Sequence, residues 1–249
     1  MLEAKIRYED LLSGDVIPVT GVGHVRSPKL KEMAPTSGIG WSAYNLYLTF
    51  LKAGKELISK ALKKEVESDD QIFNEIIQDE SLRELYEKAF SFFICENVQY
   101  NNEFKCYLVI REEDGEKPHL EGLIDAERFD YARSAILLAN YVSLDKTSVS
   151  IKHSSAAAKA AWERAQAFLS EQESKEDEAM SFGNMLSKVC TIHPSLNYLN
   201  VFELTMFQFY DTFFQCCYMR STEFSESIVA QHGSKDFQYT DWMNPVKNY

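Results

Sequence analysis

Residues 200–218 read NVFELTMFQFYDTFFQCCY, and this stretch decides what kind of fold the chain needs. Four polar side chains repeat along it at helical spacing and make one narrow stripe: Gln208, Asp211, Thr212 and Gln215. The rest of the predicted helix is apolar round nearly its whole circumference, so protein must cover it, either the chain's own or a partner's. Asn200 and Glu203 have the spacing of a capping box, which predicts that the helix begins at Asn200.

Composition bounds the class of protein. The chain has 249 residues, of which 45% are hydrophobic, enough for a sizeable core in one or two domains. Its net charge of −12 argues against a nucleic-acid surface, which needs clustered Lys and Arg. We find no signal peptide and no apolar run long enough for a bilayer, so we expect a cytoplasmic protein that does not bind membranes. Five cysteines without a CxxC pair favour reduced thiols.

The first half of the chain mixes short strands with helices. Gly21 and Gly23 lie in the predicted turn of a small hairpin, because glycine adopts positive φ without strain. Ser27 and Pro28 have the residue types of a helix N-cap and first helical position. The amphipathic stretch 41–64 is either one helix or a helix pair, and in a pair Gly54 is the break. The predicted strands cover 16–20, 24–26, 104–111 and 119–124, and the predicted helices 27–34, 41–64, 68–77, 80–95 and 125–140.

The composition changes after about residue 145, where an alanine-rich stretch precedes an acidic one. We therefore predict three parts: an α+β module at 1–150, an alanine-rich helix and acidic linker at 151–179, and a helical module at 180–249. The fold class is mainly helical α+β, with small β-hairpins in the N-terminal module and helices alone in the C-terminal one. In the last part, Gly233 is expected to end a separate helix over 223–231.

Candidates for chemistry are poor. Gly54-Lys55 lacks the earlier glycine and the following Ser or Thr of a phosphate loop. Cys190 and His193 offer two zinc ligands, whereas a structural site needs four. We therefore expect no metal, no cofactor and no catalytic residues, and hence a protein that is not an enzyme.

Three blocks of sequence carry a resemblance. They are KIRYEDLLSGDVIPVTGVGHVRSPKLKEMAP with SGIGWSAYNLYLTFL at 5–51, LIDAERFDYARSAILLAN at 123–140, and SLNYLNVFELTMFQFYDTFFQ with HGSKDFQYTDWMNPV at 195–246. Together they resemble tail assembly chaperone proteins of tailed bacteriophages and prophages of low-GC Gram-positive bacteria. The genes of those proteins lie between the genes for the tail-tube protein and the tape-measure protein.

The resemblance implies a chaperone that binds the tape measure protein, tail-tube subunits or both during virion morphogenesis in the host cytoplasm. Homo-oligomers are compatible with it, and a structural component retained in the phage tail or connector is the alternative. A small enzyme or regulator is a third class, for which the sequence offers no residue set. For protein–protein interaction we select the aromatic side chains near the C-terminus as candidate partner-binding residues: Phe207, Tyr210, Phe214, Phe237, Tyr239 and Trp242.

Overall fold

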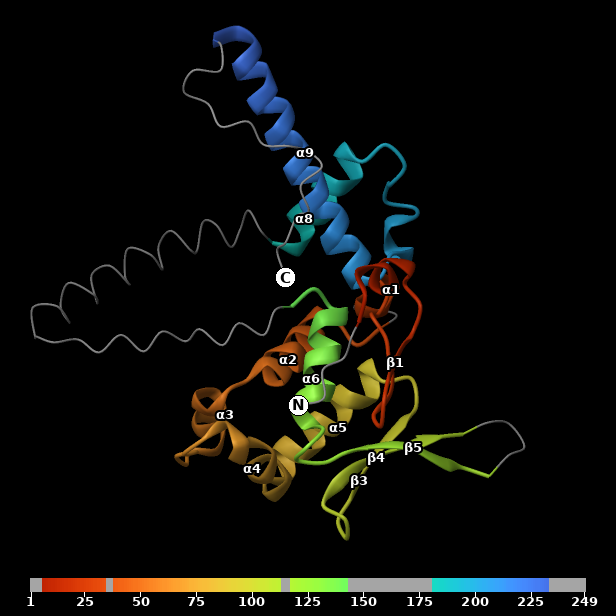
Figure 1. Ribbon diagram of the computed structural model, residues 1–249, viewed down its shortest axis with the longest axis vertical. Helices are drawn as coiled ribbons and strands as arrows, with labels where there is room; N and C mark the ends of the chain where they lie inside the picture. Colours follow the sequence, from red (N-terminus) through yellow and green to blue (C-terminus); the bar gives the residue numbers. More distant parts are fainter. Residues whose placement is uncertain (1–5, 35–37, 113–116, 143–180, 233–249) are drawn as a thin grey trace, which may run out of the picture. The chain divides into compact units, whose positions relative to one another are not determined.

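The computed structural model describes residues 6–34, 38–112, 117–142 and 181–232 (Figure 1). The chain forms two compact units. The first comprises Met1–Leu144 with Phe202–Tyr210, and the second comprises Asp145–Val201 with Asp211–Asn248. The short segment 202–210 thus groups with residues that lie far before it in the sequence. The predicted alanine-rich helix and acidic linker lie outside the described residues.

The first unit contains a β-hairpin, a three-stranded antiparallel sheet and several helices. Its strands are β1 (Ile17–Val19), β2 (Gly23–Val25), β3 (Asn97–Asn101), β4 (Cys106–Arg111) and β5 (His119–Ile124). Its helices are α1 (Tyr8–Ser13), α2 (Trp41–Lys52), α3 (Lys55–Leu62), α4 (Ile72–Gln78), α5 (Glu80–Phe93) and α6 (Phe129–Ala139), with 3-10 turns at Leu30–Met33 and Asp69–Gln71. The predicted fold class, mainly helical α+β, is confirmed.

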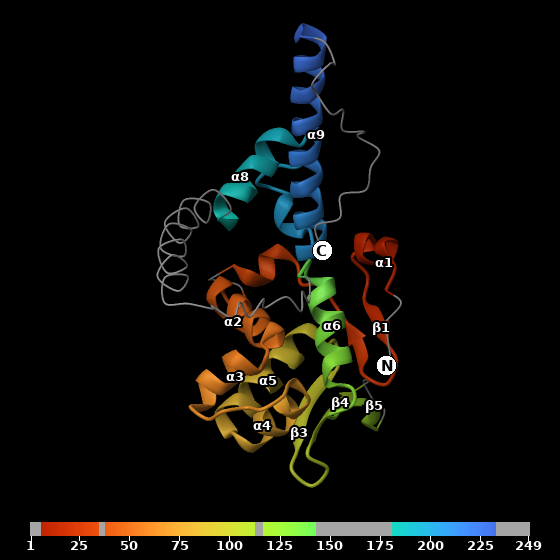
Figure 2. The same ribbon diagram turned by 60° about the vertical axis from the view of Figure 1, so that its left-hand side comes forward.

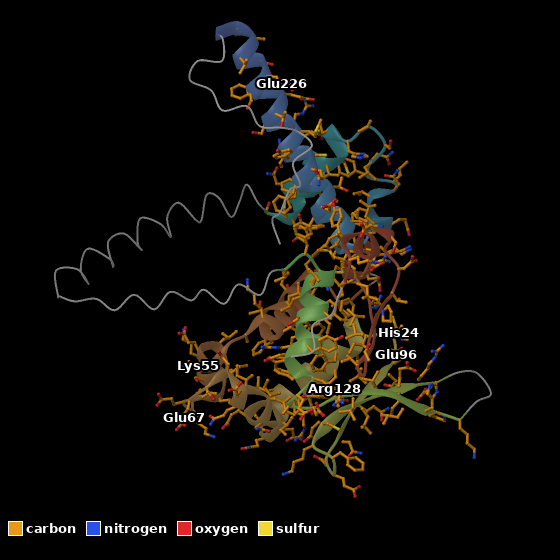
Figure 3. The ribbon with its side chains drawn as sticks, viewed as in Figure 1. His24, Lys55, Glu67, Glu96, Arg128 and Glu226 are labelled. Atoms are coloured by element: carbon orange, nitrogen blue, oxygen red, sulfur yellow. The ribbon has the colours of Figure 1, made fainter. Side chains whose placement is uncertain are left out.

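Most local predictions in this unit are confirmed. Gly21 and Gly23 have φ of 75° and 126° in and beside the β1–β2 turn. The chain breaks between α2 and α3 at Gly54, and the side chain of Asp69 accepts a hydrogen bond from the Lys55 N–H at the start of α3. The Lys55 ammonium also donates to the Glu67 carbonyl, and Figure 3 shows these two residues close together.

The second sheet is larger than predicted, because β3 precedes the expected hairpin of β4 and β5. The outer edge of β3 is occupied by side chains of α5. Ser91 donates to the Val98 carbonyl, and Glu87 accepts from the Tyr100 N–H. These bonds satisfy backbone groups that would otherwise be open to pairing with another strand.

An aromatic cluster forms the core of the first unit. Phe90, on α5, is fully buried, and its ring lies 6.0 Å from Tyr86, 5.3 Å from Tyr107 and 6.2 Å from Phe129. The helix α5 packs against α2, α4 and β3, as Figure 2 shows. Burial raises the pKa of the Tyr107 phenol well above its ordinary value, and the Tyr107 hydroxyl donates to the Arg83 carbonyl.

The described elements after residue 180 are helical: α8 (Phe182–Ile192), a 3-10 turn (Val201–Glu203) and α9 (Met206–His232). Helix α8 buries Met185 and Val189 and lies beside α9 in both ribbon views (Figures 1 and 2). The prediction of a separate helix over 223–231 is wrong, because α9 runs through that range without a break. Gly233 lies outside the described residues. Among the described helices, none is both long and apolar enough to cross a bilayer.

Candidate functional site

The first turn of α9 is built into the first unit. Phe207 is fully buried, with its ring 6.1 Å from Tyr8 and 5.2 Å from Tyr141. Tyr210 is half-buried and stacks on Tyr141 at 6.0 Å, and burial raises the pKa of its phenol. The protein itself therefore covers Phe207 fully and Tyr210 in part.

Backbone hydrogen bonds hold this turn against residues 27–30. The Leu30 N–H donates to the Leu204 carbonyl, and the Met206 N–H donates to the Pro28 carbonyl, each at 2.9 Å. The Ser27 hydroxyl accepts from the Phe207 N–H at 3.1 Å. The prediction that Ser27 caps its own helix is wrong: its chain continues into a 3-10 turn that begins at Leu30, and its oxygen caps α9 instead.

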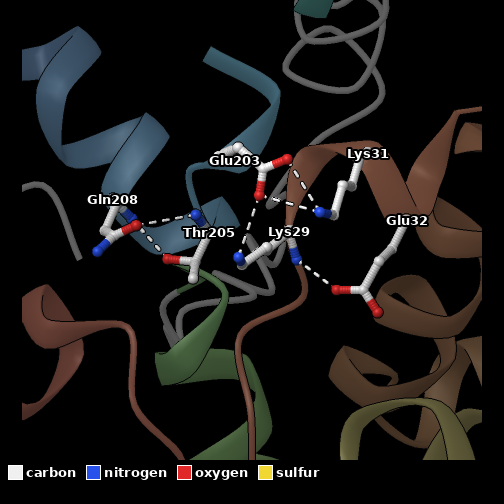
Figure 4. Close-up of polar contacts among 6 residues, drawn as sticks. All are labelled: Lys29, Lys31, Glu32, Glu203, Thr205 and Gln208. Carbon is white, nitrogen blue, oxygen red and sulfur yellow. Dashed lines mark hydrogen bonds and ion pairs between the residues drawn. The ribbon is translucent and has the colours of Figure 1, made fainter. Parts of the chain in front are cut away.

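The predicted capping box is also displaced. The Thr205 N–H donates to Gln208 Oε1 at 2.9 Å, and the Gln208 N–H donates to the Thr205 hydroxyl at 3.2 Å (Figure 4). These reciprocal bonds have the form of a capping box. The predicted capping box began at Asn200, and the observed one begins five residues later. The Asn200 side chain instead accepts from the Asn197 N–H.

Exposed charges flank the same turn. The Glu203 carboxylate lies 2.9 Å from the Lys31 ammonium and 3.2 Å from that of Lys29 (Figure 4). Hydrogen bonds from Lys31 and Lys29 lower the pKa of Glu203. Glu32 accepts from the Lys29 N–H at 2.7 Å. This arrangement, which we call the Glu203 triad (Glu203, Lys29 and Lys31), joins segment 202–210 to residues 29–31 by charge as well as by backbone.

The second unit exposes several large apolar side chains. Leu199 is 94% exposed and Phe224 is 67% exposed, while Tyr198 and Met219 are also exposed. Phe214, the third candidate partner-binding residue, is half-buried beside Phe213, with ring centroids 5.4 Å apart. The tail candidates Phe237, Tyr239 and Trp242 lie outside the described residues. Whether the candidate residues bind a partner stays a prediction.

The exposed Leu199 lies on an ordered loop. Asn197 Oδ1 accepts from the Leu199 N–H at 2.9 Å, and the Asn200 side chain donates to the Ser195 carbonyl at 2.9 Å. The Tyr198 hydroxyl donates to Ser187 Oγ on α8 at 3.2 Å. These bonds hold the loop so that Leu199 points into solvent. The turn-forming residue types between Pro194 and Asn200 are the sequence signal for this loop.

The candidates for metal and thiol chemistry are cysteines and a histidine of the second unit. The described residues contain no group of three or more His, Cys, Asp and Glu side chains placed to hold a metal ion. Burial raises the pKa of the Cys190, Cys216 and Cys217 thiols, which disfavours the nucleophilic thiolate. His193 accepts a hydrogen bond from the Ser195 N–H, so it serves the loop after α8.

Comparison with known proteins gives one match. Residues 172–247 match the family model described as the YomV second domain, and YomV is a protein of a Bacillus prophage region. No curated protein and no solved structure matches the chain. The matched range includes the described segment 181–232, and therefore the exposed Leu199 and Phe224.

Proposed function

We propose that this protein is a non-catalytic tail assembly chaperone of a tailed bacteriophage or prophage. It binds the tape measure protein, and with it tail-tube subunits, in the host cytoplasm while the tail is built. A tape-measure protein is a long helical chain whose apolar faces need a cover before the tube forms round it. Support comes from the sequence resemblance and from the prophage origin of the family that residues 172–247 match.

The observation that carries the proposal is the exposure of Leu199 and Phe224 within the matched range. Exposed large apolar side chains rimmed by polar groups are typical of protein–protein contact sites. The Leu199 loop is already held by hydrogen bonds, so little conformational entropy is lost when it docks. Because Asn197 and Asn200 are used within the loop, the expected contact is an apolar one.

The test is co-expression with the tape-measure protein of the same phage or prophage. The wild-type chain should keep the tape measure in the soluble fraction and co-purify with it. The double variant Leu199→Glu with Phe224→Glu should reduce the co-purified tape measure by about tenfold or more, since buried charges oppose docking. Phe104→Glu is the matched control, because Phe104 is 68% exposed on the first unit, close to the 67% of Phe224.

If the double variant recovers as much tape-measure protein as the wild type does, the surface with Leu199 and Phe224 is not the binding site. An insoluble tape measure despite the wild-type chain would exclude the chaperone role. Mass spectrometry of purified virions distinguishes the chaperone from the alternative function. Stoichiometric copies of the protein in the particle would identify it as a structural component of the tail or connector.

A further inference from the structure

An open hollow of about 620 Å³ lies in the first unit between the β1–β2 hairpin and the end of β4. Its lining comes from three separate segments: Val16 and His24 from the hairpin region, Cys95 to Asn97 from the link between α5 and β3 and the start of β3, and Ile110 to Glu112 from the end of β4 and the residue after it. The volume is within the range of ligand sites, roughly 300–1,000 Å³. None of these residues takes part in the proposed contact of the second unit.

A carboxylate and an imidazole are paired in the wall of this hollow. Glu96 has a side chain only 6% exposed, and its carboxylate accepts from His24 Nδ1 and, at 3.0 Å, from the His24 N–H. Figure 3 shows the two residues together. A carboxylate at Nδ1 fixes the proton there in the neutral ring, which leaves Nε2 as a hydrogen-bond acceptor. The His24 side chain is 28% exposed and lines the hollow, so a ligand that enters the hollow can reach it.

Aliphatic side chains continue from the hollow onto the sheet. Val16 is 51% exposed, and Ile110, on the same lining, pairs directly with Leu120 of β5. Directly paired residues of antiparallel strands lie on the same face, so Leu120, 56% exposed, extends the apolar wall beyond the hollow. An occupant that covers the whole strip is therefore longer than a small metabolite.

We propose that this hollow and strip bind an extended polypeptide segment, whose N–H or hydroxyl donor meets His24 Nε2 and whose apolar side chains cover Val16, Ile110 and Leu120. The wall carries two carboxylates, Glu96 and Glu112, and one cationic group, Arg111, which suits the N–H donors of a peptide backbone better than a highly anionic ligand. The proposal rests on the proposed function in one respect: the segment belongs to the tape-measure protein.

The variant His24→Asn isolates the ligand contact from the structural one. An asparagine amide can still donate to Glu96 from near the position of Nδ1, but it has no atom at the position of Nε2. We expect unchanged thermal stability and roughly tenfold weaker binding of the co-expressed tape measure, the loss of one hydrogen bond at a desolvated site.

Cys95 reports occupancy, because it lines the hollow and is exposed, while Cys217 is exposed in the second unit. Alkylation rates in the full-length protein, alone and in complex, are read for each thiol by mass spectrometry. We expect the Cys95 rate to fall about tenfold in the complex, as for a covered side chain. In the Leu120→Lys variant, which disrupts the strip, the Cys95 alkylation rate should be the same with the tape-measure protein as without it.

The outcomes separate the two proposals. If the complex forms and Cys95 reacts as fast as in the free protein, the hollow is not the peptide site and the chaperone role stands. If the wild-type chain forms no complex, both proposals fall. If micromolar zinc alone protects Cys95, the hollow is a metal site and the peptide assignment is overturned.

Discussion

The aromatic cluster in the core of the first unit differs in burial from the apolar side chains that the second unit exposes. In the first unit Phe90, Tyr107 and Phe129 are closed into a core, and even Phe207 from near the C-terminus is buried there. In the second unit Phe224 and Leu199 face solvent. The same residue types thus stabilise the core of the first unit and are available for contacts where they are exposed, on Leu120 of the first unit as well as on the second unit. A count of apolar residues predicts that something must cover them, but only the structure shows which ones the chain covers itself.

The largest expected effect tests this contrast directly. Phe90→Ala removes a ring that contacts three aromatic neighbours and leaves a cavity, so we expect a loss of about 3–5 kcal/mol in the free energy of unfolding. Phe224→Ala, at an exposed position, should change it by no more than about 0.5 kcal/mol. Urea denaturation measures both. A similar loss in the two variants would show that Phe224 is part of a core.

The next effect concerns how closely β5 approaches the β1–β2 turn. A Cβ built on Gly122 would lie 2.7 Å from the Gly21 carbonyl oxygen, a backbone atom that cannot move alone. Gly122→Ala should therefore cost about 1–3 kcal/mol through overpacking. Gly183→Ala is the control, since nothing lies within 4 Å of a Cβ there and alanine favours helix α8. In thermal unfolding, Gly122→Ala should have a lower melting temperature than the wild type, and Gly183→Ala a higher one.

A smaller effect tests whether the start of α9 belongs to the first unit. Ser27→Ala removes the hydroxyl that accepts from the Phe207 N–H, which should cost about 0.5–2 kcal/mol, as for an N-cap. Hydrogen exchange of the Phe207 amide should accelerate in this variant. Ser81→Ala, at an exposed position of α5, should leave that amide unchanged. An unchanged exchange rate of the Phe207 amide in Ser27→Ala would show that the Ser27 hydroxyl does not cap α9.

Local patterns predicted the elements of the first unit better than their connections. The β1–β2 turn, the break at Gly54 and the pairing of β4 with β5 follow from glycine and from period-two alternation, which are local signals. Strand β3 was missed because its pairing with β4 and its edge contacts to Ser91 and Glu87 are tertiary. Its own residues, NVQYN, are mostly polar.

The start of α9 shows why the candidate site was harder to predict. Asn200 with Glu203 and Thr205 with Gln208 have equally good capping-box spacing, so the sequence alone does not choose between them. The choice is made by residues 27–30, more than 170 positions earlier, which supply two backbone partners and one hydroxyl. The same contacts bury Phe207, and no local pattern distinguishes a ring buried in this way from one available to a partner.

The smallest expected effect comes from the Glu203 triad, where the charges are exposed. The folded pKa of Glu203 is lowered, chiefly by the hydrogen bond from Lys31, so the pair stabilises the folded state when the carboxylate is ionised. This contribution is complete above the ordinary glutamate value of about 4.5 and is lost as the pH falls below it through the folded value. Glu203→Gln should remove that part of the pH dependence, and salt should weaken it in the wild type by screening. Melting temperatures measured across this pH range at low and high salt test the prediction. If Glu203→Gln has the same pH profile as the wild type, segment 202–210 is held by Ser27, Pro28 and Leu30 without help from charge.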